Sequence, residues 1–251
     1  GEIAMLAIAR RNAILELLRE QQSVNVTQLA AALGVATETI RRDLKELESS
    51  GQLIRTHGGA YITDGVQNDI NVSARSVIRK QEKREIARKC AQTGDSIFLD
   101  ASTTDWCIAQ ELLEKNITVL TNSLKVADIL SASASVKLIL AGGNYAPRTR
   151  SFYGEQTVED LSRYYADKAF ISCRTVHMEF GATDSNEGEA LARRTMLRRS
   201  HSTYLAVDHS KLDGISFLNI CPLEDLTGII CDRPLSLVWQ NHLKSIGVEC
   251  Y

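Results

Sequence analysis

The N-terminal part of the chain carries apolar side chains at the spacing of amphipathic helices. A first helix is marked by an apolar face at Ile8, Ile14, Leu15, Leu17 and Leu18, and it ends in the polar segment 20–23. A second helix over residues 26–33 stops at Gly34, which suits the left-handed turn between two crossing helices. The pattern therefore predicts two successive short helices.

A third helix is predicted over residues 36–49, because Ile40, Leu44 and Leu47 recur on one helix face. Gly51 ends it, and two short strand-like runs then flank His57-Gly58-Gly59. Residues 1–62 are therefore expected to form a three-helix domain with one β-wing.

The pattern changes after residue 62. Residues 63–73 hold few large apolar side chains, which predicts a linker. Beyond it, strand-like runs alternate with helix-length segments, at residues 96–100, 117–120, 136–140, 169–173, 204–208 and 228–231. This alternation predicts an α/β domain over residues 74–251, with a mostly parallel sheet covered by helices on both faces.

Composition narrows the classes of protein. With 251 residues, 44% of them hydrophobic, the chain can bury a large core and a small second one. The net charge of −2 gives no overall basic field, so a nucleic-acid surface must be local. We find no membrane-spanning run and no signal-like start, which predicts a cytoplasmic protein with no membrane partner. The six cysteines form no Cys-x-x-Cys pair, so we expect small buried side chains and no metal.

The predicted third helix has a polar face suited to the DNA major groove. Thr37 and Arg41 are the candidates for contacts to base edges, while Arg42 and Lys45 are candidates for phosphate contacts. The wing adds Arg55 and His57 as further phosphate contacts. The alternative is a solvated amphipathic helix, and the seven basic and seven acidic residues within 1–62 leave both interpretations open.

Polar residues follow the predicted strands of the second domain. Ser102, Thr103 and Thr104 come after Asp100 at the start of a helix, where free N–H groups and hydroxyls suit a phosphate. Ordinary helix capping is the alternative explanation. Other strands end in 121–123, 142–143 and 208–211. In a parallel sheet such ends share one edge, so a common ligand crevice is expected.

The stretch 37–60 resembles the signature of the DeoR family of bacterial sugar-metabolism regulators. Its pattern is Thr-x-Thr-Ile-Arg-Arg-Asp-Leu-x-x-Leu-Glu-x-x-Gly-x-Leu-x-Arg-x-His-Gly-Gly-Ala. The resemblance implies a winged helix-turn-helix, with Thr39 added to the DNA-contacting set, and an effector domain similar to ribose-5-phosphate isomerase. It also implies operator DNA and a phosphorylated sugar as partners.

The same resemblance extends to the strand ends, where the family has Asp-x-x-Thr-Thr, Thr-Asn, Gly-Gly and Asp-x-Ser-Lys. It implies phosphate binding by Ser102, Thr103, Thr104 and Lys211 and sugar binding by Asp100, Asn122, Asp184 and Asn186, with Thr121, Gly142 and Gly143 in the site and Glu187 a further candidate. Many members carry Gly where Ser102 stands. Segments 99–103, 170–173 and 181–186 resemble most the members that control L-fucose utilisation, which implies a ketose 1-phosphate such as fuculose 1-phosphate.

Two other functions fit parts of the pattern. A sugar-phosphate isomerase would need an acidic segment, yet residues 172–178 hold no acid, so we expect no enzyme. A sugar-phosphate binding protein without DNA affinity would leave the first domain unexplained. The segment 141–144 lacks the Gly-Lys-Ser/Thr ending of a nucleotide loop, and no cofactor is expected. Paired operator half-sites imply a homodimer or tetramer.

Overall fold

The computed structural model describes residues 7–21, 23–49, 52–55, 58–61, 80–90 and 96–251. The chain divides into two compact units, Gly1–Ile78 and Arg79–Tyr251. The predicted linker, residues 63–73, lies outside the described residues. Each unit is described by itself.

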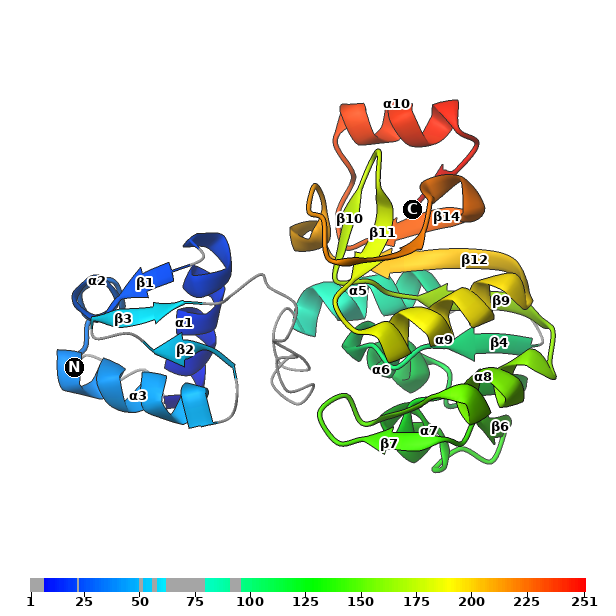
Figure 1. The fold of residues 1–251 in the computed structure, drawn as a ribbon, viewed down its shortest axis with the longest axis horizontal. Coiled ribbons are helices and arrows are strands. Elements are labelled where there is room, and N and C mark those ends of the chain that lie inside the picture. The colour runs from blue at the N-terminus through cyan, green and yellow to red at the C-terminus, as the bar shows by residue number, and fades with distance from the viewer. Residues whose placement is uncertain (1–6, 22, 50–51, 56–57, 62–79, 91–95) are drawn as a thin grey trace. The chain divides into compact units, whose positions relative to one another are not determined.

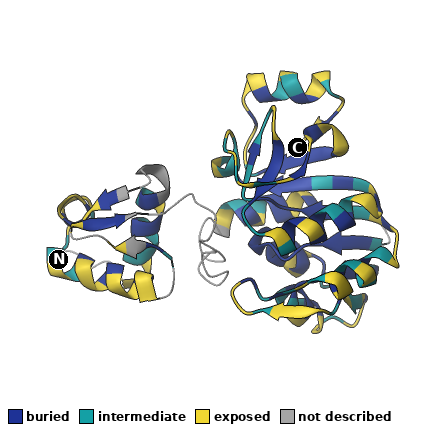
Figure 2. Ribbon diagram, in the orientation of Figure 1, coloured by how far each residue is buried: buried dark blue, intermediate teal, exposed yellow. Residues whose placement is uncertain are grey.

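The N-terminal unit contains the three predicted helices, α1 (Ala7–Gln21), α2 (Val26–Leu33) and α3 (Thr37–Ser49). The wing is formed by β2 (Ile54–Arg55) and β3 (Gly59–Tyr61), and Gly34 ends α2 at φ 65° as predicted. The buried faces of all three helices meet in one core (Figure 2). One prediction is wrong: Ile8 is 73% exposed, because it lies six residues before Ile14 and beyond the packed part of α1.

A third strand, β1 (Ser23–Asn25), was not predicted. It pairs antiparallel with β3, giving the order β1-β3-β2. Gly59 permits this pairing, because a Cβ there would lie 1.9 Å from the carbonyl oxygen of Val24. The segment 20–23 looked like a polar break because three residues are too few to show a strand period.

The C-terminal unit is built on a seven-stranded parallel sheet of order β15-β14-β12-β9-β4-β5-β6 (Figure 1). Its strands are β4 (Ser96–Leu99), β5 (Ile117–Thr121), β6 (Val136–Leu140), β9 (Ala166–Ile171), β12 (Ser200–Val207), β14 (Gly228–Cys231) and β15 (Glu249–Cys250). The first six confirm the predicted strands.

Helices cover both faces of this sheet, as predicted. α5 (Lys80–Cys90), α6 (Thr103–Glu111) and α7 (Leu124–Leu130) pack in series on one face, while α8 (Glu155–Ser162) and α9 (Glu187–Arg198) pack together on the other (Figure 1). α10 (Leu237–Ser245) follows β14 and buries Trp239.

Five cysteines are buried as expected, whereas Cys250 is exposed. Within the described part of the chain, no helix is both long and apolar enough to span a bilayer.

Two small antiparallel elements were not predicted. β10 (Thr175–His177), β11 (Gly181–Asp184) and β13 (Leu218–Cys221) form a second sheet, and β7 (Asn144–Ala146) pairs with β8 (Ser151–Tyr153). Each strand has only three or four residues, which is too short for a clear alternation of polar and apolar positions.

The order of the large sheet reverses at β4. The chain continues from β4 through β5 to β6 on one side, and from β9 through β12 to β14 on the other. In open α/β sheets, ligands bind beyond the carboxyl ends of the strands at such a reversal. The loops after β4 and β9 therefore mark the expected ligand crevice.

Candidate functional sites

The outer face of α3 carries exposed charges of both signs, with Glu38, Glu46 and Glu48 beside its basic residues. Ile40, Leu44 and Leu47 are buried beneath it, whereas Arg41, Arg42 and Lys45 are exposed. Thr37 and Thr39 are half-buried near the start of the helix. Arg41 Nη1 lies 3.1 Å from Glu38 Oε2, but both side chains are well exposed, so water screens this pair. The face therefore presents three exposed cations to solvent.

The wing contributes Arg55, which is exposed on β2. Its Nε donates to Glu48 Oε2 at 2.8 Å, so the wing is tied to the end of α3. This contact, together with the Arg55 amide, holds the pKa of the Glu48 carboxyl below its usual value. His57 lies outside the described residues.

Asp43 is a functional candidate that the sequence interpretation missed. It sits on the inner face of α3, 2% exposed, and accepts from Arg10 Nε at 2.5 Å and from Arg11 Nε at 3.0 Å. Both arginines belong to α1. A buried carboxylate between two helices fixes their mutual orientation, so Asp43 sets the angle at which α3 presents its outer face.

In the C-terminal unit, polar contacts connect the strand ends at the reversal point. Lys211, on the short 3-10 helix His209–Lys211 after β12, donates from Nζ to Ser172 Oγ at 2.8 Å. The Ser172 amide, after β9, donates to Asp100 Oδ2 at 2.9 Å. The predicted lysine and the predicted loop after β4 are thus joined through Ser172, to which the sequence interpretation assigned no role.

The loop after β4 leads directly into α6. Ser102 is the N-cap of α6, and its Oγ accepts from the Asp105 amide at 3.0 Å, so the capping interpretation applies to this hydroxyl. Thr103 and Thr104 follow in the first turn and are buried. Thr104 Oγ1 has no hydrogen-bond partner among the described residues.

The end of β5 contains a similar unpaired group. Asn122 is 2% exposed and donates from Nδ2 to the carbonyl of Phe152, yet its Oδ1 lacks a partner within the part of the chain that the structure describes. Thr121 Oγ1 accepts from the Ser123 amide at 3.0 Å and shapes the turn. Because a buried unsatisfied polar atom costs about 1–3 kcal/mol, such atoms mark positions where a polar ligand would be stabilised.

Gly142 and Gly143 lie apart from this network and pack on α8. The Gly142 amide donates to Asp160 Oδ2 at 3.0 Å, and its carbonyl accepts from Thr157 Oγ1 at 2.6 Å. Gly143 has φ +129°, and a Cβ there would lie 2.2 Å from Thr157 Oγ1. The pair therefore has a clear packing role.

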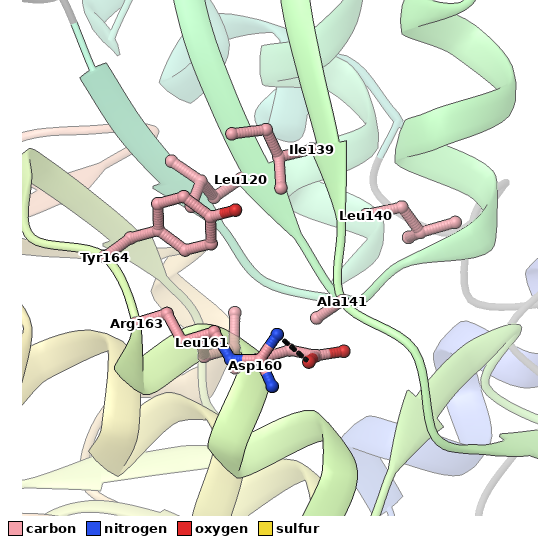
Figure 3. Close-up of a pocket in the computed structure, with 8 residues that line it drawn as sticks. All are labelled: Leu120, Ile139, Leu140, Ala141, Asp160, Leu161, Arg163 and Tyr164. Atoms are coloured by element: carbon pink, nitrogen blue, oxygen red, sulfur yellow. Dashed lines mark ion pairs between the residues drawn. The ribbon is translucent and has the colours of Figure 1, made fainter.

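A small cavity of about 170 Å³ adjoins this glycine segment (Figure 3). Strand residues form one wall and α8 with the following turn forms the other, and the ion pair between Asp160 and Arg163 lies at its side. It is lined by Leu120, Ile139, Leu140, Ala141, Asp160, Leu161, Arg163 and Tyr164. None of these side chains belongs to the predicted set of effector contacts.

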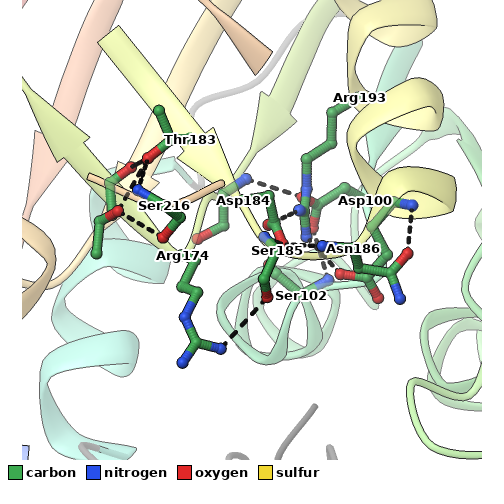
Figure 4. A network of polar contacts seen from close by, with 12 residues as sticks. Asp100, Ser102, Arg174, Thr183, Asp184, Ser185, Asn186, Arg193 and Ser216 are labelled. Atoms are coloured by element: carbon green, nitrogen blue, oxygen red, sulfur yellow. Dashed lines mark hydrogen bonds and ion pairs between the residues drawn. The ribbon is translucent and has the colours of Figure 1, made fainter. Parts of the chain in front are cut away.

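Asp100 and Asp184 meet in a buried ion network that the sequence interpretation did not predict (Figure 4). Arg193 of α9 is 3% exposed and donates to Asp100 Oδ2, to Asp184 Oδ2 and to Glu189 Oε2. The pair with Glu189 is a local i,i+4 contact, but no local signal connects Arg193 with Asp100, which is 93 positions away. Asn186 caps α9 by accepting the Glu189 amide at 3.0 Å, and Glu187 is exposed.

The pKa values of two neighbouring buried carboxyls, Asp100 and Asp105, are shifted in opposite directions. Burial alone would raise the pKa of Asp100, but the Arg193 guanidinium and the Ser172 amide bring that pKa down to about 2. Burial and the neighbouring Asp100 charge raise the pKa of Asp105 well above its usual value. Asp100 is therefore ionised near neutral pH, whereas ionisation of Asp105 is opposed.

His209 is half-buried and its Nδ1 lies 2.9 Å from Asp232 Oδ2. Among the described residues, no three side chains of His, Cys, Asp or Glu are grouped so as to hold a metal ion.

Known proteins resemble both units. The DeoR-like helix-turn-helix domain family matches residues 10–65, and the DeoR C terminal sensor domain family matches residues 78–233. The HTH-type transcriptional regulator YulB of Bacillus subtilis is 37% identical over 92% of this chain and 91% of its own. The L-fucose operon activator of Haemophilus influenzae is 33% identical over 90% of this chain and 92% of its own.

Several other transcription regulators are also near 30% identity, so the fucose activator does not stand apart from them. Ribose 5 phosphate isomerase A from Neisseria gonorrhoeae is 16% identical, with a TM-score of 0.37 over 53% of each chain. A structural similarity of that size carries no argument about function.

Proposed function

The chain belongs to the DeoR family of helix-turn-helix transcription regulators, and we propose that a phosphorylated sugar controls its binding to the operator of a carbohydrate-utilisation operon. Like its relatives, the protein is a transcription regulator and not an enzyme. Three of the buried carboxylates agree with this, because Asp100, Asp184 and Glu189 are all paired with Arg193.

The observation that carries the effector proposal is the pair of unsatisfied buried atoms at neighbouring strand ends. Thr104 Oγ1 lies in the first turn of α6, directly after the β4 loop, and Asn122 Oδ1 lies directly after β5, next to the reversal of the sheet. Lys211, linked to the β4 loop through Ser172, supplies a cation. A phosphate ester with sugar hydroxyls offers both the charge and the hydrogen bonds that these groups lack.

We propose the individual roles on the basis of these contacts and of the family resemblance. We assign phosphate binding to Lys211 and to the 102–104 loop, through its hydroxyls and the first amides of α6. Asn122 and Asn186 are assigned to sugar hydroxyls. Thr121, Gly142 and Gly143 are assigned to the edge of the proposed effector crevice. The proposed ligand is a ketose 1-phosphate such as L-fuculose 1-phosphate, because segments 99–103, 170–173 and 181–186 resemble those of the family members that control L-fucose utilisation.

On the DNA side, Thr37, Thr39 and Arg41 are assigned to base edges, and Arg42, Lys45, Arg55 and His57 to phosphates. The exposure of Arg41, Arg42, Lys45 and Arg55 supports a contact with DNA for these side chains. A homodimer or homotetramer is proposed, because repeated half-sites require symmetric readers.

A thermal-shift screen tests the effector class. The full chain is heated with L-fuculose 1-phosphate, fructose 1-phosphate, glucose 6-phosphate or glycerol 3-phosphate, and with the same compounds without phosphate. We expect one phosphorylated compound to raise the melting temperature selectively, because a ligand of the native state stabilises it. If none does, the sensor assignment is wrong and only the DNA-binding assignment stands.

Two substitutions test the division of roles. Arg41→Ala is expected to weaken operator binding by about 1–3 kcal/mol, the usual value of a base contact, and to leave effector affinity unchanged. Lys211→Ala is expected to lower effector affinity at least tenfold and to leave effector-free operator binding unchanged. Lys244→Ala, at an exposed position of α10, is the matched charge control. Parallel loss of both activities in either folded variant would contradict the modular assignment.

A further inference from the structure

Arg193 occupies an unusual position between the two loops assigned to the effector. From the middle of α9 its guanidinium reaches Asp100 Oδ2 at 2.5 Å, Asp184 Oδ2, and Glu189 Oε2 at 3.1 Å. The side chain is 3% exposed and its nitrogens point at carboxylates (Figure 4). Such an arginine is unsuited to touching a ligand itself.

Each aspartate uses its second oxygen to hold a loop backbone. Asp100 Oδ1 accepts from the Ser102 amide at 2.6 Å, which shapes residues 102–104 after β4, called the hydroxyl loop below. Asp184 Oδ1 accepts from the Ser185 amide at 2.6 Å and from the Asn186 amide at 3.1 Å, which shapes the loop before α9. One guanidinium is therefore connected to two loop backbones, each through a single carboxylate.

Charge alone does not account for this arrangement. A lysine at position 193 would keep the positive charge but would offer one compact ammonium group in place of a planar fork. It would not reach both aspartates with directed hydrogen bonds, because those carboxylates are bound by different nitrogens of Arg193, Nε and Nη1. The geometry of arginine, rather than its charge, is what relates the two loops.

We propose that Arg193 is a positioning residue for effector recognition, which fixes the hydroxyl loop and the loop before α9 at one ligand-ready separation. The inference rests on the proposed function, since it assumes that a sugar phosphate bridges these two loops. It changes the roles predicted from sequence for Asp100 and Asp184, which act through Arg193 and the loop amides rather than by direct contact with sugar hydroxyls.

The test compares Arg193→Lys with Arg194→Lys in the full chain. Arg194 is the neighbouring arginine of α9, and it donates to the carbonyl of Asn219 instead of to the network. The ligand is whichever of the four phosphorylated compounds stabilises the wild type most. Affinity is measured by calorimetry below the melting temperature, and hydrogen exchange is measured by mass spectrometry for segments 100–104, 184–187 and 204–207.

We expect Arg193→Lys to lower effector affinity at least tenfold and to speed exchange in both loops, with β12 segment 204–207 unchanged. Arg194→Lys should resemble the wild type. Wild-type affinity in Arg193→Lys would overturn the inference, and so would faster exchange in one loop only or throughout the unit. If the wild type binds none of the four compounds, the proposed effector class fails, and the positioning role fails with it.

Discussion

Replacing Asp43 by Asn tests whether a buried ion pair holds the recognition helix in place. The Asp43 carboxylate is 2% exposed and binds two arginines of α1, whose side chains are 12% exposed for Arg10 and 33% exposed for Arg11. The variant keeps the size and polarity of the side chain but removes the charge that both guanidinium groups face.

The magnitude follows from these exposures. Removing one partner of a fully buried ion pair costs about 3–5 kcal/mol. Since Arg11 is one-third exposed, water compensates part of its loss, and we expect a decrease of about 2–3 kcal/mol in the free energy of unfolding of the N-terminal unit. For a unit of this size, that corresponds to a decrease of about 8–24 °C in melting temperature.

Two optical signals separate the units. Both tryptophans, Trp106 and Trp239, belong to the C-terminal unit, so their fluorescence follows that unit alone, whereas far-ultraviolet circular dichroism follows both. Asp43→Asn should add an early transition to the dichroism curve and leave the fluorescence curve unchanged. Glu48→Gln removes only the half-exposed pair with Arg55 and should change little.

The result that refutes this reasoning is a dichroism curve for Asp43→Asn that coincides with the wild-type curve. Operator affinity provides a second measurement, because α3 would lose part of its attachment to α1 and present its outer face less uniformly. We expect weaker operator binding even at temperatures where the variant is fully folded.

Three further predictions concern the C-terminal unit. Asp105→Asn should raise the melting temperature at pH 8 more than at pH 5. The pKa of the wild-type carboxyl is raised, so the folded wild type loses stability as rising pH ionises this group, whereas the amide does not ionise. Asp100→Asn should cost about 3–5 kcal/mol at pH 7, and about 2 kcal/mol of this difference should disappear as the pH falls from the usual carboxyl pKa of 3.8 towards the wild-type pKa of about 2. Gly143→Ala should lower the melting temperature through its clash with Thr157, whereas Gly142→Ala, whose Cβ would lie 3.5 Å from its nearest neighbour, should be tolerated.

Much of the fold could be predicted, because its longer helices and strands have a local period of apolar and polar residues. The inner face of α3 and the six main strands each have enough residues to show a period, and the structure confirms them. β1 has three residues and depends on Gly59 of a later strand, so no local pattern signals it. Ile8 has the right residue type for a core, but whether a helix end is covered depends on the length of its neighbours.

The candidate site shows a different limit. Sequence identifies polar residues at strand ends, and Asp100, Thr104 and Asn122 are indistinguishable on that basis. The structure separates them by hydrogen bonding, since Asp100 is engaged on both oxygens while Thr104 and Asn122 each retain an unsatisfied atom.

The engagement of Asp100 Oδ2 depends on Arg193, which is 93 positions away in the sequence. A carboxylate near a ligand site can contact the ligand, or it can accept hydrogen bonds from the backbone of a loop that contacts the ligand. Which of the two it does depends on whether a cation is paired with it, and that cation can be distant in the sequence. In this protein a single buried arginine engages two such carboxylates. Under the proposed function, the residues assigned to contact with the sugar phosphate are the neutral ones, together with Lys211.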